Sequence, residues 1–442
     1  MSNEGMFTMD DTGSPVTARS DATAGPEMCF SPPRQTVSYP KSKIKILLLE
    51  GVSDEAVNIL KQEGFNVEAH RGKLPDDELA EKIRDAHCVG IRSGTKLTKE
   101  LLALGQRLLC VGCFCIGSEQ VDLQSAQSLG VPVFNSPFCN TRSVAELIVA
   151  AVISLARRLG DKNKELHSGH WNKSAKGCHE VRGKTLGIVG YGHIGSQLSV
   201  MAEALGMRVI FHDIVPKLPL GNSRQVADLN TLLEQSHFVT MHVPSTPQTK
   251  NMIGEEQIKL MRRGSFLLNA SRGSVVIIPD LVKALKSGHL AGAYVDVYPH
   301  DMEPGSVSDN WECDLRGCPN TLLTPHIGGS TEEAQAAIGV DVANKIVNYI
   351  NAGASIGAVN FPQIGLPYGG PQTHRILSIH RNRPGVLRDI NLILADFNVT
   401  RQVLGTQGDV GYLVVEVDRA ASKPIKDAII KLEASIKTRI LF

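Results

Sequence analysis

The chain has 442 residues, of which 42% are hydrophobic and 21% are charged, and its formal net charge is +1. At roughly 150 residues per domain this length predicts about three domains, and the composition is that of a globular protein. A net charge so close to zero excludes a bulk attraction to nucleic acid or to a membrane surface, so an anionic ligand must be held by local basic residues.

Residues 1–42 are rich in Ser, Thr, Pro, Gly and Asp and lack hydrophobic periodicity, which predicts a disordered N-terminal extension. The segment has no apolar core and carries several acidic residues, which argues against a secretory or mitochondrial leader. No apolar run of the sequence approaches the roughly 20 residues that span a bilayer. The 9 cysteines lack the paired spacing of a metal site and are typical of free thiols in a reducing compartment. We therefore expect a cytoplasmic protein without a bound metal.

Apolar, β-branched runs alternate with amphipathic stretches from residue 43 onward. Strands that are apolar throughout and are separated by helices indicate a parallel sheet covered on both faces. The first series predicts strands at 44–49, 88–91, 108–114 and 131–134, and helices at 53–63 and 75–84. After a helix at 143–159, the second series predicts strands at 185–189, 208–212, 237–242, 265–269, 291–297 and 321–323, and a helix at 331–349.

The pattern changes after residues 357–371, whose high Gly and Pro content predicts a linker. Beyond it the predicted order is strand–helix–strand–strand–helix–strand, at 375–380, 385–397, 399–404, 412–417, 424–434 and 438–441. That order is typical of a ferredoxin-like fold. The predicted fold class is therefore α/β, with two doubly wound parallel-sheet domains followed by a small C-terminal α+β domain.

A dinucleotide-binding turn follows the first strand of the second series. Gly190, Gly192 and Gly195 form a GxGxxG motif between a strand and a helix, and Asp213 ends the next strand. The three glycines permit, in order, a tight turn, close approach of the backbone to a pyrophosphate, and close packing of the helix on the sheet. Because Asp213 can accept hydrogen bonds from ribose hydroxyls and Ile214 offers no cation for a 2′-phosphate, the motif predicts NAD rather than NADP.

Candidate catalytic residues follow strands of the same series, where ligands of open parallel sheets bind. Oxidation of a hydroxy acid requires a base for the hydroxyl proton, a cation for the carboxylate, and an acidic residue that orients the base. His326, Arg272 and Glu303 suit these three tasks in that order. Asp301 remains an alternative to Glu303 as the partner of His326.

Three short stretches resemble the Arg–Glu–His set of the D-2-hydroxyacid dehydrogenase family, at residues 271–273, 303–304 and 325–330. Three others resemble a branch of that family that oxidises D-3-phosphoglycerate, at residues 112–117, 135–146 and 171–173. The resemblance implies NAD-dependent oxidation of this small phosphorylated hydroxy acid to 3-phosphohydroxypyruvate, the first step of L-serine synthesis, by a homo-oligomer, a tetramer. Counted from Asp296, the family usually places its acidic residue at the position of Asp301. Glu303, however, precedes a proline, as the acidic residue of the family does.

The same resemblance implies the domain boundaries and the binding residues. It implies a flavodoxin-like substrate-binding domain (43–141 and 330–358), a Rossmann NAD-binding domain (142–329), a linker (359–373) and a regulatory domain (374–442). The expected cofactor contacts, beside the three glycines, are His193, Ile194, Asp213, Ala270, Ser271, Asp296, Gly328 and Gly329. The expected substrate contacts are Arg92, Ser93, Asn140 and Arg142, although the two arginines also fit an ordinary solvated surface.

Residues 379–387 resemble the opening of an ACT domain, a small amino-acid-sensing fold. The resemblance implies an allosteric site for L-serine that includes His380, Asn382 and Asn398. A purely structural dimerisation domain is the alternative, because a fold does not dictate a function.

Two alternatives to the implied activity remain open at this point. The first is another dehydrogenase of the same fold, acting on 2-hydroxyglutarate, glyoxylate or hydroxypyruvate. The second is a binding protein that senses NAD, like the corepressors of this fold. A panel of substrates that carry or lack a phosphate group distinguishes the first alternative from the implied activity. An assay of NADH oxidation distinguishes the second.

Overall fold

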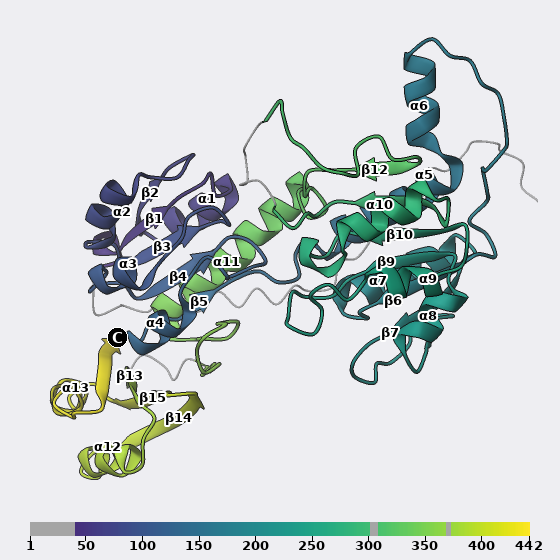
Figure 1. The fold of residues 1–442 in the computed structure, drawn as a ribbon. Coiled ribbons are helices and arrows are strands. Elements are labelled where there is room, and N and C mark those ends of the chain that lie inside the picture. The colour runs from purple at the N-terminus through teal and green to yellow at the C-terminus, as the bar shows by residue number, and fades with distance from the viewer. Residues whose placement is uncertain (1–39, 301–307, 368–372) are drawn as a thin grey trace, which may run out of the picture. The chain divides into compact units, whose positions relative to one another are not determined.

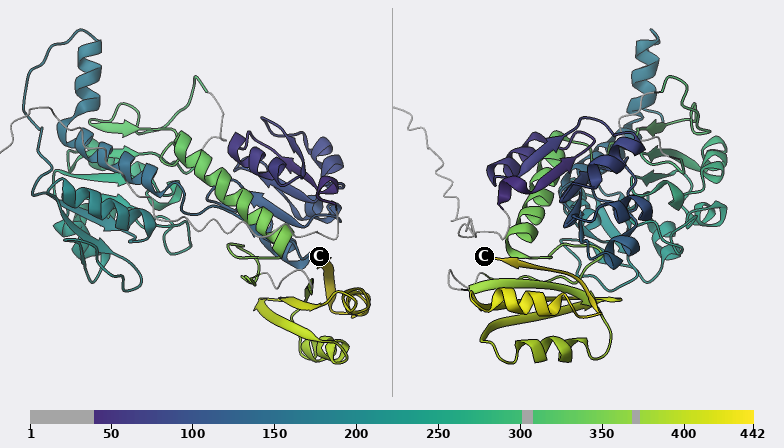
Figure 2. Two further views of the ribbon diagram at one scale, coloured as in Figure 1. Left: turned by 180° about the vertical axis from the view of Figure 1, so that it is seen from behind. Right: turned by 90° about the vertical axis from the view of Figure 1, so that its left-hand side faces the viewer.

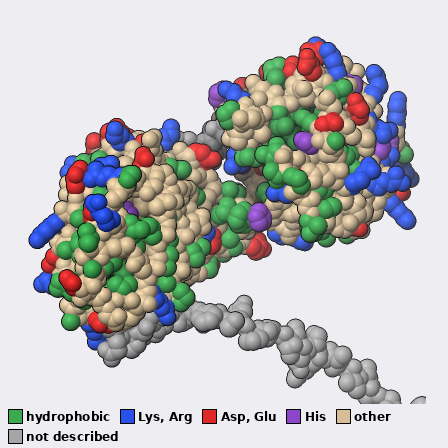
Figure 3. All heavy atoms as spheres, turned by 90° about the horizontal axis from the view of Figure 1, so that it is seen from below, with side chains coloured by type: hydrophobic (Ala, Val, Ile, Leu, Met, Phe, Trp, Pro, Cys, Tyr) green, Lys and Arg blue, Asp and Glu red, His purple; other side chains and the backbone are tan. Residues whose placement is uncertain are grey.

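The computed structural model describes residues 40–300, 308–367 and 373–442. Apart from residues 40–42, the predicted N-terminal extension lies outside these ranges; Lys41–Lys43 form a short 3-10 helix, η1, so order begins slightly before residue 43. None of the helices within the described ranges is long and apolar enough to cross a membrane. On the face shown in Figure 3, acidic and basic side chains are interspersed among polar and hydrophobic ones, consistent with the small net charge.

The first domain is a five-stranded parallel sheet of order β2-β1-β3-β4-β5, the flavodoxin-like arrangement that was expected. Its strands are β1 (Lys45–Leu48), β2 (Asn66–Ala69), β3 (Cys88–Ile91), β4 (Cys110–Cys113) and β5 (Val133–Phe134), and its helices are α1 (Asp54–Gln62), α2 (Asp76–Ile83), α3 (Lys99–Leu104) and α4 (Leu123–Ser128). The sequence prediction missed β2, because this edge strand is largely exposed and lacks an apolar run.

A helix from much later in the chain completes this domain. α11 (Glu332–Ala352) lies along β4 and β5 (Figure 1) and buries Val342 and Ile346 in the same core. Gly112 on β4 makes this close packing possible, since a Cβ there would lie 2.8 Å from Cδ1 of Ile346. The side chain of Thr331 caps the start of α11, and Gly353 ends it with a φ of +71°.

The second domain is a seven-stranded parallel sheet of order β12-β11-β10-β9-β6-β7-β8. From β8 to β11 this is the strand order of the Rossmann fold, and β12 is one further strand beside β11. The strands are β6 (Thr185–Val189), β7 (Arg208–His212), β8 (Arg224–Gln225), β9 (Phe238–Met241), β10 (Ser265–Asn269), β11 (Leu290–Val295) and β12 (Thr321–Leu323). The helices are α5 (Thr141–Arg157), α6 (Leu159–His167), α7 (His193–Ala204), α8 (Leu229–Gln235), α9 (Glu255–Leu260) and α10 (Ile278–Lys286), with a 3-10 turn η2 (Gly273–Val275).

The single helix predicted at 143–159 is two helices. α5 ends at Arg157 because Arg158 adopts a left-handed conformation with a φ of +53°. α6 then projects from the sheet and buries none of its residues (Figure 1).

The C-terminal domain has the predicted strand–helix–strand–strand–helix–strand order. Its elements are β13 (Thr373–Arg381), α12 (Val386–Leu394), β14 (Val399–Gln407), β15 (Val410–Asp418), α13 (Ser422–Ile429) and β16 (Ser435–Leu441), in an antiparallel sheet of order β14-β15-β13-β16. Both helices pack on one face of the sheet (Figure 2). The other face contributes Leu377, Ile379 and Tyr412 to the core that contains α11.

A buried ion pair lies on that second face. Arg375 and Glu416, 4% and 2% exposed, are bonded across β13 and β15, with 3.1 Å between Nε and Oε1. Arg375 also donates to the carbonyl oxygens of Ala352 (2.7 Å) and Pro367 (2.8 Å). This guanidinium therefore bonds the sheet to the end of α11.

Replacing Glu416 by Ala is expected to lower the free energy of unfolding by about 3–5 kcal/mol, because Arg375 would keep a buried charge without its counter-charge. Thermal and urea denaturation of the full chain measure the loss. Glu433→Ala, which removes the exposed partner of Arg383, is the matched control and should leave the midpoint almost unchanged. Equal stability of the two variants would contradict the role assigned to the buried pair.

Candidate active site

The glycine turn has the shape that a dinucleotide pyrophosphate requires. Gly190 has a φ of +92°, and a Cβ there would lie 2.4 Å from the carbonyl oxygen of His242. A Cβ at Gly195 would lie 2.3 Å from the oxygen of Gly190, so α7 packs directly on the turn. At Gly192, by contrast, a Cβ would meet nothing within 4 Å. Open space therefore lies beside this residue at the positive end of the α7 dipole, where a diphosphate was expected from the sequence.

Asp213, which was expected from the sequence to bind a ribose, also stabilises this turn. Its Oδ2 accepts the backbone N–H of Tyr191 (2.9 Å) and its Oδ1 accepts that of Val215 (3.2 Å). The neighbouring Ile214 is 96% exposed and offers no positive charge to a 2′-phosphate. The carboxylate retains acceptor capacity for two ribose hydroxyls, which favours NAD.

The loop after β10 presents Arg272. Asn269, the last residue of β10, accepts the backbone N–H (3.1 Å) and the hydroxyl (2.8 Å) of Ser271 on its Oδ1. Its Nδ2 donates to the carbonyl oxygen of Arg272 (3.0 Å). Sequence reasoning missed Asn269, although a polar residue that ends an otherwise apolar strand is a recognisable signal. Ala270 is half-buried in the same loop.

The acidic partner of the proposed base lies beyond what the structure describes. A Cβ at Gly273 would lie 1.9 Å from the carbonyl oxygen of Tyr298, so the Arg272 loop packs against the chain just before residues 301–307. Glu303 and its alternative Asp301 both fall in that range, outside the described residues.

Asp296, expected from the sequence to contact the cofactor, uses its carboxylate to hold the His326 turn. Asp296 follows β11 and is 0% exposed. Its Oδ1 accepts the hydroxyl of Thr324 (2.6 Å) and the N–H of Ile327 (2.9 Å), and its Oδ2 accepts the N–H of Gly328 (2.8 Å). Its backbone oxygen accepts the N–H of His326 (2.8 Å). Asp296 thus holds four of the residues from 324 to 328, three through its carboxylate and His326 through its backbone oxygen.

His326 itself has a left-handed backbone and an exposed side chain. Its φ is +54°, in the left-handed region that residues with a Cβ occupy uncommonly and that Asn, Asp and His occupy more often than most. Strained conformations of this kind persist where the surroundings enforce them, and they concentrate at active sites. The hydrogen bonds to Asp296 are the surroundings that enforce this one.

Asn140 is the one substrate candidate that lies directly against this turn. A Cβ at Gly329 would lie 2.1 Å from Nδ2 of Asn140, whose side chain is 5% exposed. The Oδ1 of Asn140 has no hydrogen-bond partner within the described ranges. It is a buried acceptor next to Gly329 without a partner among the described residues, which is unusual because buried polar atoms are nearly always hydrogen-bonded.

The other substrate candidates differ in how they are held. Arg92 donates to Oε1 of Gln335 on α11 (2.7 Å), which directs its guanidinium, and Ser93 beside it is exposed. Arg142 instead pairs with Glu146 one turn along α5 (2.5 Å), and its side chain is 61% exposed. The structure therefore gives Arg92 a fixed orientation and leaves Arg142 on the surface.

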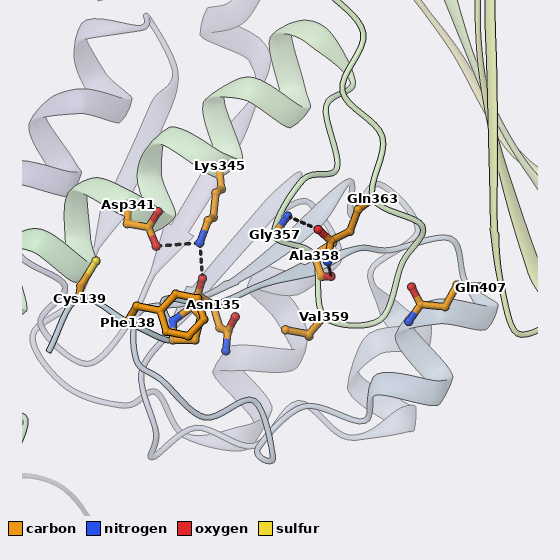
Figure 4. A pocket seen from close by; sticks show the side chains of 11 residues that line it. Asn135, Phe138, Cys139, Asp341, Lys345, Gly357, Ala358, Val359, Gln363 and Gln407 are labelled. Carbon is orange, nitrogen blue, oxygen red and sulfur yellow. Dashed lines mark hydrogen bonds and ion pairs between the residues drawn. The ribbon is translucent and has the colours of Figure 1, made fainter. Parts of the chain in front are cut away.

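The loop before Asn140 contacts both the glycine turn and a cavity. The ring of Phe138 lies 3.8 Å from that of His193, at the start of α7 next to Ile194. Behind the loop is a cavity of about 540 Å³, where Nζ of Lys345 donates to the carbonyl oxygen of Asn135 (2.8 Å) and pairs with Asp341 (2.7 Å), as Figure 4 shows. Lys345 thereby fixes the backbone of the loop that carries Asn140.

The three effector candidates do not converge within one chain. Asn382 donates to the carbonyl oxygen of Gly408, just after β14, whereas Asn398 lies just before β14. A nine-residue strand separates them by about 30 Å. His380 is 4% exposed, and its burial lowers the pKa of the imidazole, which favours the neutral form.

Comparisons with known proteins agree with this architecture. Residues 149–328 match the family model described as D-isomer specific 2-hydroxyacid dehydrogenase, NAD binding domain, and residues 376–437 match an AHAS small subunit-like ACT domain. The D-3-phosphoglycerate dehydrogenase of Dictyostelium discoideum is 60% identical over 407 residues, which cover 92% of this chain and 99% of that protein. The enzyme of the same name from Escherichia coli K12 is 49% identical over 411 residues, covering 92% and 99%.

Solved structures share the fold of the first two domains. The TT0316 protein from Thermus thermophilus is 31% identical, with a TM-score of 0.62 over 69% of this chain and 96% of its own. D-2-hydroxyisocaproate dehydrogenase, at 24% identity, has a TM-score of 0.65 over 72% of this chain and 100% of its own. The comparisons confirm the family resemblance, the fold class and NAD as the cofactor. This chain belongs to the D-3-phosphoglycerate dehydrogenase branch of the D-isomer-specific 2-hydroxyacid dehydrogenases, which are NAD-dependent enzymes.

Proposed function

We propose that this chain oxidises D-3-phosphoglycerate to 3-phosphohydroxypyruvate with NAD, the first step of L-serine synthesis. The observation that carries the proposal is the meeting of three strand ends at one edge of the sheet. Arg272, Asp296 and His326 follow the neighbouring parallel strands β10, β11 and β12, at the same edge as the glycine turn. The names of relatives that match nearly the whole chain support the same substrate.

The proposed mechanism gives each side chain one task. NAD, when bound, accepts a hydride from the carbon that carries the substrate hydroxyl. The imidazole of His326 takes the hydroxyl proton, and Glu303, or Asp301, stabilises the resulting positive charge. The guanidinium of Arg272 binds the substrate carboxylate and polarises the reacting oxygen.

The phosphate of the substrate is assigned to Arg92 and Ser93 of the first domain. Arg92 is oriented by Gln335 and stands next to the exposed hydroxyl of Ser93. The amide of Asn140 is assigned to the substrate near His326. Arg142 is less suited to bind the phosphate, because its guanidinium already pairs with Glu146.

We also propose that L-serine inhibits the enzyme at the ACT domain and that the active form is a cytoplasmic homotetramer. Since about 30 Å separates Asn382 from Asn398 in one chain, a serine site built from both requires two chains. Trp171, 77% exposed after the projecting α6, is suited to contact with a neighbouring subunit.

Removing either proposed catalytic side chain should abolish most turnover while leaving NADH binding intact. His326→Gln and Arg272→Gln are expected to lower kcat by about 10²–10⁴-fold, because each removes a group that acts in the transition state. NADH binding is followed by fluorescence, and turnover by NADH oxidation with 3-phosphohydroxypyruvate. The exposed Arg316 provides a control variant, Arg316→Gln. Near-normal turnover in both active-site variants would refute the proposal.

The phosphate assignment predicts a change in substrate preference. Arg92→Met should raise the KM for 3-phosphohydroxypyruvate by about 10-fold or more, because a charge-assisted contact is lost. The KM for hydroxypyruvate, which lacks the phosphate, should change little. Arg142→Met is the matched control and should have a smaller effect. A parallel loss with both substrates would assign Arg92 to the shared carboxylate end instead.

The two-chain serine site can be tested by complementation. Asn382→Ala and Asn398→Ala should each abolish inhibition by L-serine without changing basal turnover. Oligomers mixed from the two variants should recover part of the inhibition, because one intact pair of side chains re-forms between chains. Inhibition that persists in both variants, or that is absent from the unaltered enzyme, would contradict the effector proposal.

A further inference from the structure

A buried tyrosine hydroxyl lies behind the carboxylate of Asp296. Tyr294, on β11, is 2% exposed and packs in the core of the second domain. Its hydroxyl lies 2.9 Å from Oγ1 of Thr324, which lies 2.6 Å from Oδ1 of Asp296. The three groups form a chain that leads from the core to the turn carrying His326.

The direction of both hydrogen bonds in this chain is fixed by chemistry. A carboxylate only accepts, so the single hydroxyl proton of Thr324 is donated to Asp296. Oγ1 of Thr324 must then act as acceptor toward Tyr294, which donates its own proton. Burial, reinforced by the nearby charge of Asp296, raises the pKa of Tyr294 above its usual value, so the phenol keeps the proton that it donates.

Thr324 also fixes the start of the turn through its backbone. Its N–H donates to the carbonyl oxygen of Val295, and its own carbonyl oxygen accepts the hydroxyl of Tyr298 (3.1 Å). Two residues later the chain adopts the left-handed φ of +54° at His326. Asp296 bonds to residues on both sides of His326, so this one carboxylate holds the backbone from which the imidazole projects.

We propose that Tyr294 and Thr324 are positioning residues that orient Asp296 and, through it, the imidazole of His326. The inference rests on the proposed catalytic role of His326 and extends it to two residues that do not contact substrate or cofactor. Thr324 acts directly on the carboxylate, and Tyr294 acts mainly through its hydrogen bond to Thr324.

Steady-state kinetics of the full-length enzyme test this arrangement. Thr324→Val keeps the shape of the side chain but removes the donor to Asp296, and kcat is expected to fall about 10- to 50-fold. Tyr294→Phe should lower kcat about 3- to 10-fold. Because Ile327 and Gly328 keep their backbone hydrogen bonds to Asp296, the Kd for NADH should stay within about 2-fold in both variants. Thr324→Ser restores the hydroxyl and should recover most of the turnover.

A double variant distinguishes positioning from a general loss of stability. If Tyr294 acts mainly through Thr324, the Tyr294→Phe, Thr324→Val double variant should be little slower than Thr324→Val alone. Tyr412→Phe is the matched control: it removes another buried hydroxyl, which donates to the carbonyl oxygen of Gly353 (2.7 Å), and should leave kcat unchanged.

Three results would overturn the inference. They are a kcat within about 2-fold of normal in Thr324→Val, multiplicative losses in the double variant, and a weakened affinity for NADH at unchanged kcat. A weakened affinity for NADH at unchanged kcat would show that the carboxylate of Asp296 acts in cofactor binding and not on His326. If His326→Gln loses turnover while Thr324→Val does not, only this inference fails; if His326→Gln retains turnover, the proposed function fails with it.

Discussion

The arrangement of this site depends on one buried carboxylate. Asp296 is excluded from solvent and accepts hydrogen bonds from Thr324, Ile327 and Gly328, and its backbone accepts one from His326. The left-handed conformation of His326 is uncommon for a residue with a Cβ, and these bonds hold the turn in it. The imidazole is thereby fixed at the edge of the sheet where the glycine turn and the Arg272 loop also end.

The same turn continues into the helix that joins the catalytic part of the chain to the ACT domain. α11 begins at Thr331, whose hydroxyl is bonded to Ser143 on α5 (2.9 Å). At its other end Arg375 and Arg439 donate to the carbonyl oxygens of Ala352 (2.7 Å) and Tyr349 (2.6 Å). Cations near the last carbonyls stabilise a helix C-terminus. One rigid element therefore extends from beside the proposed base to the buried face of the ACT sheet.

Much of this could be predicted from local patterns in the sequence. Apolar strands separated by amphipathic helices indicated parallel sheets, and the order of elements indicated the C-terminal fold, because periodicity reflects which side of each element is buried. The spacing of Gly190, Gly192 and Gly195 and the polar residues after successive strands marked the edge where ligands bind. The exposed strand β2 and the break at Arg158 were missed, since β2 lacks a continuous apolar run and the left-handed residue that ends α5 is an arginine and not a glycine.

The sequence by itself determined the fold class, the family and the residue types of the site. Only the tertiary structure decided that Asp296 serves the His326 turn, that Arg142 pairs with Glu146 while Arg92 is oriented by Gln335, and that Asn382 and Asn398 stand at opposite ends of a strand. The physical reason is that a hydrogen bond or an ion pair depends on distance and direction in space. Residues such as Asp296 and Gly328 are brought together by strand pairing, and nothing in their separate local sequences encodes the contact.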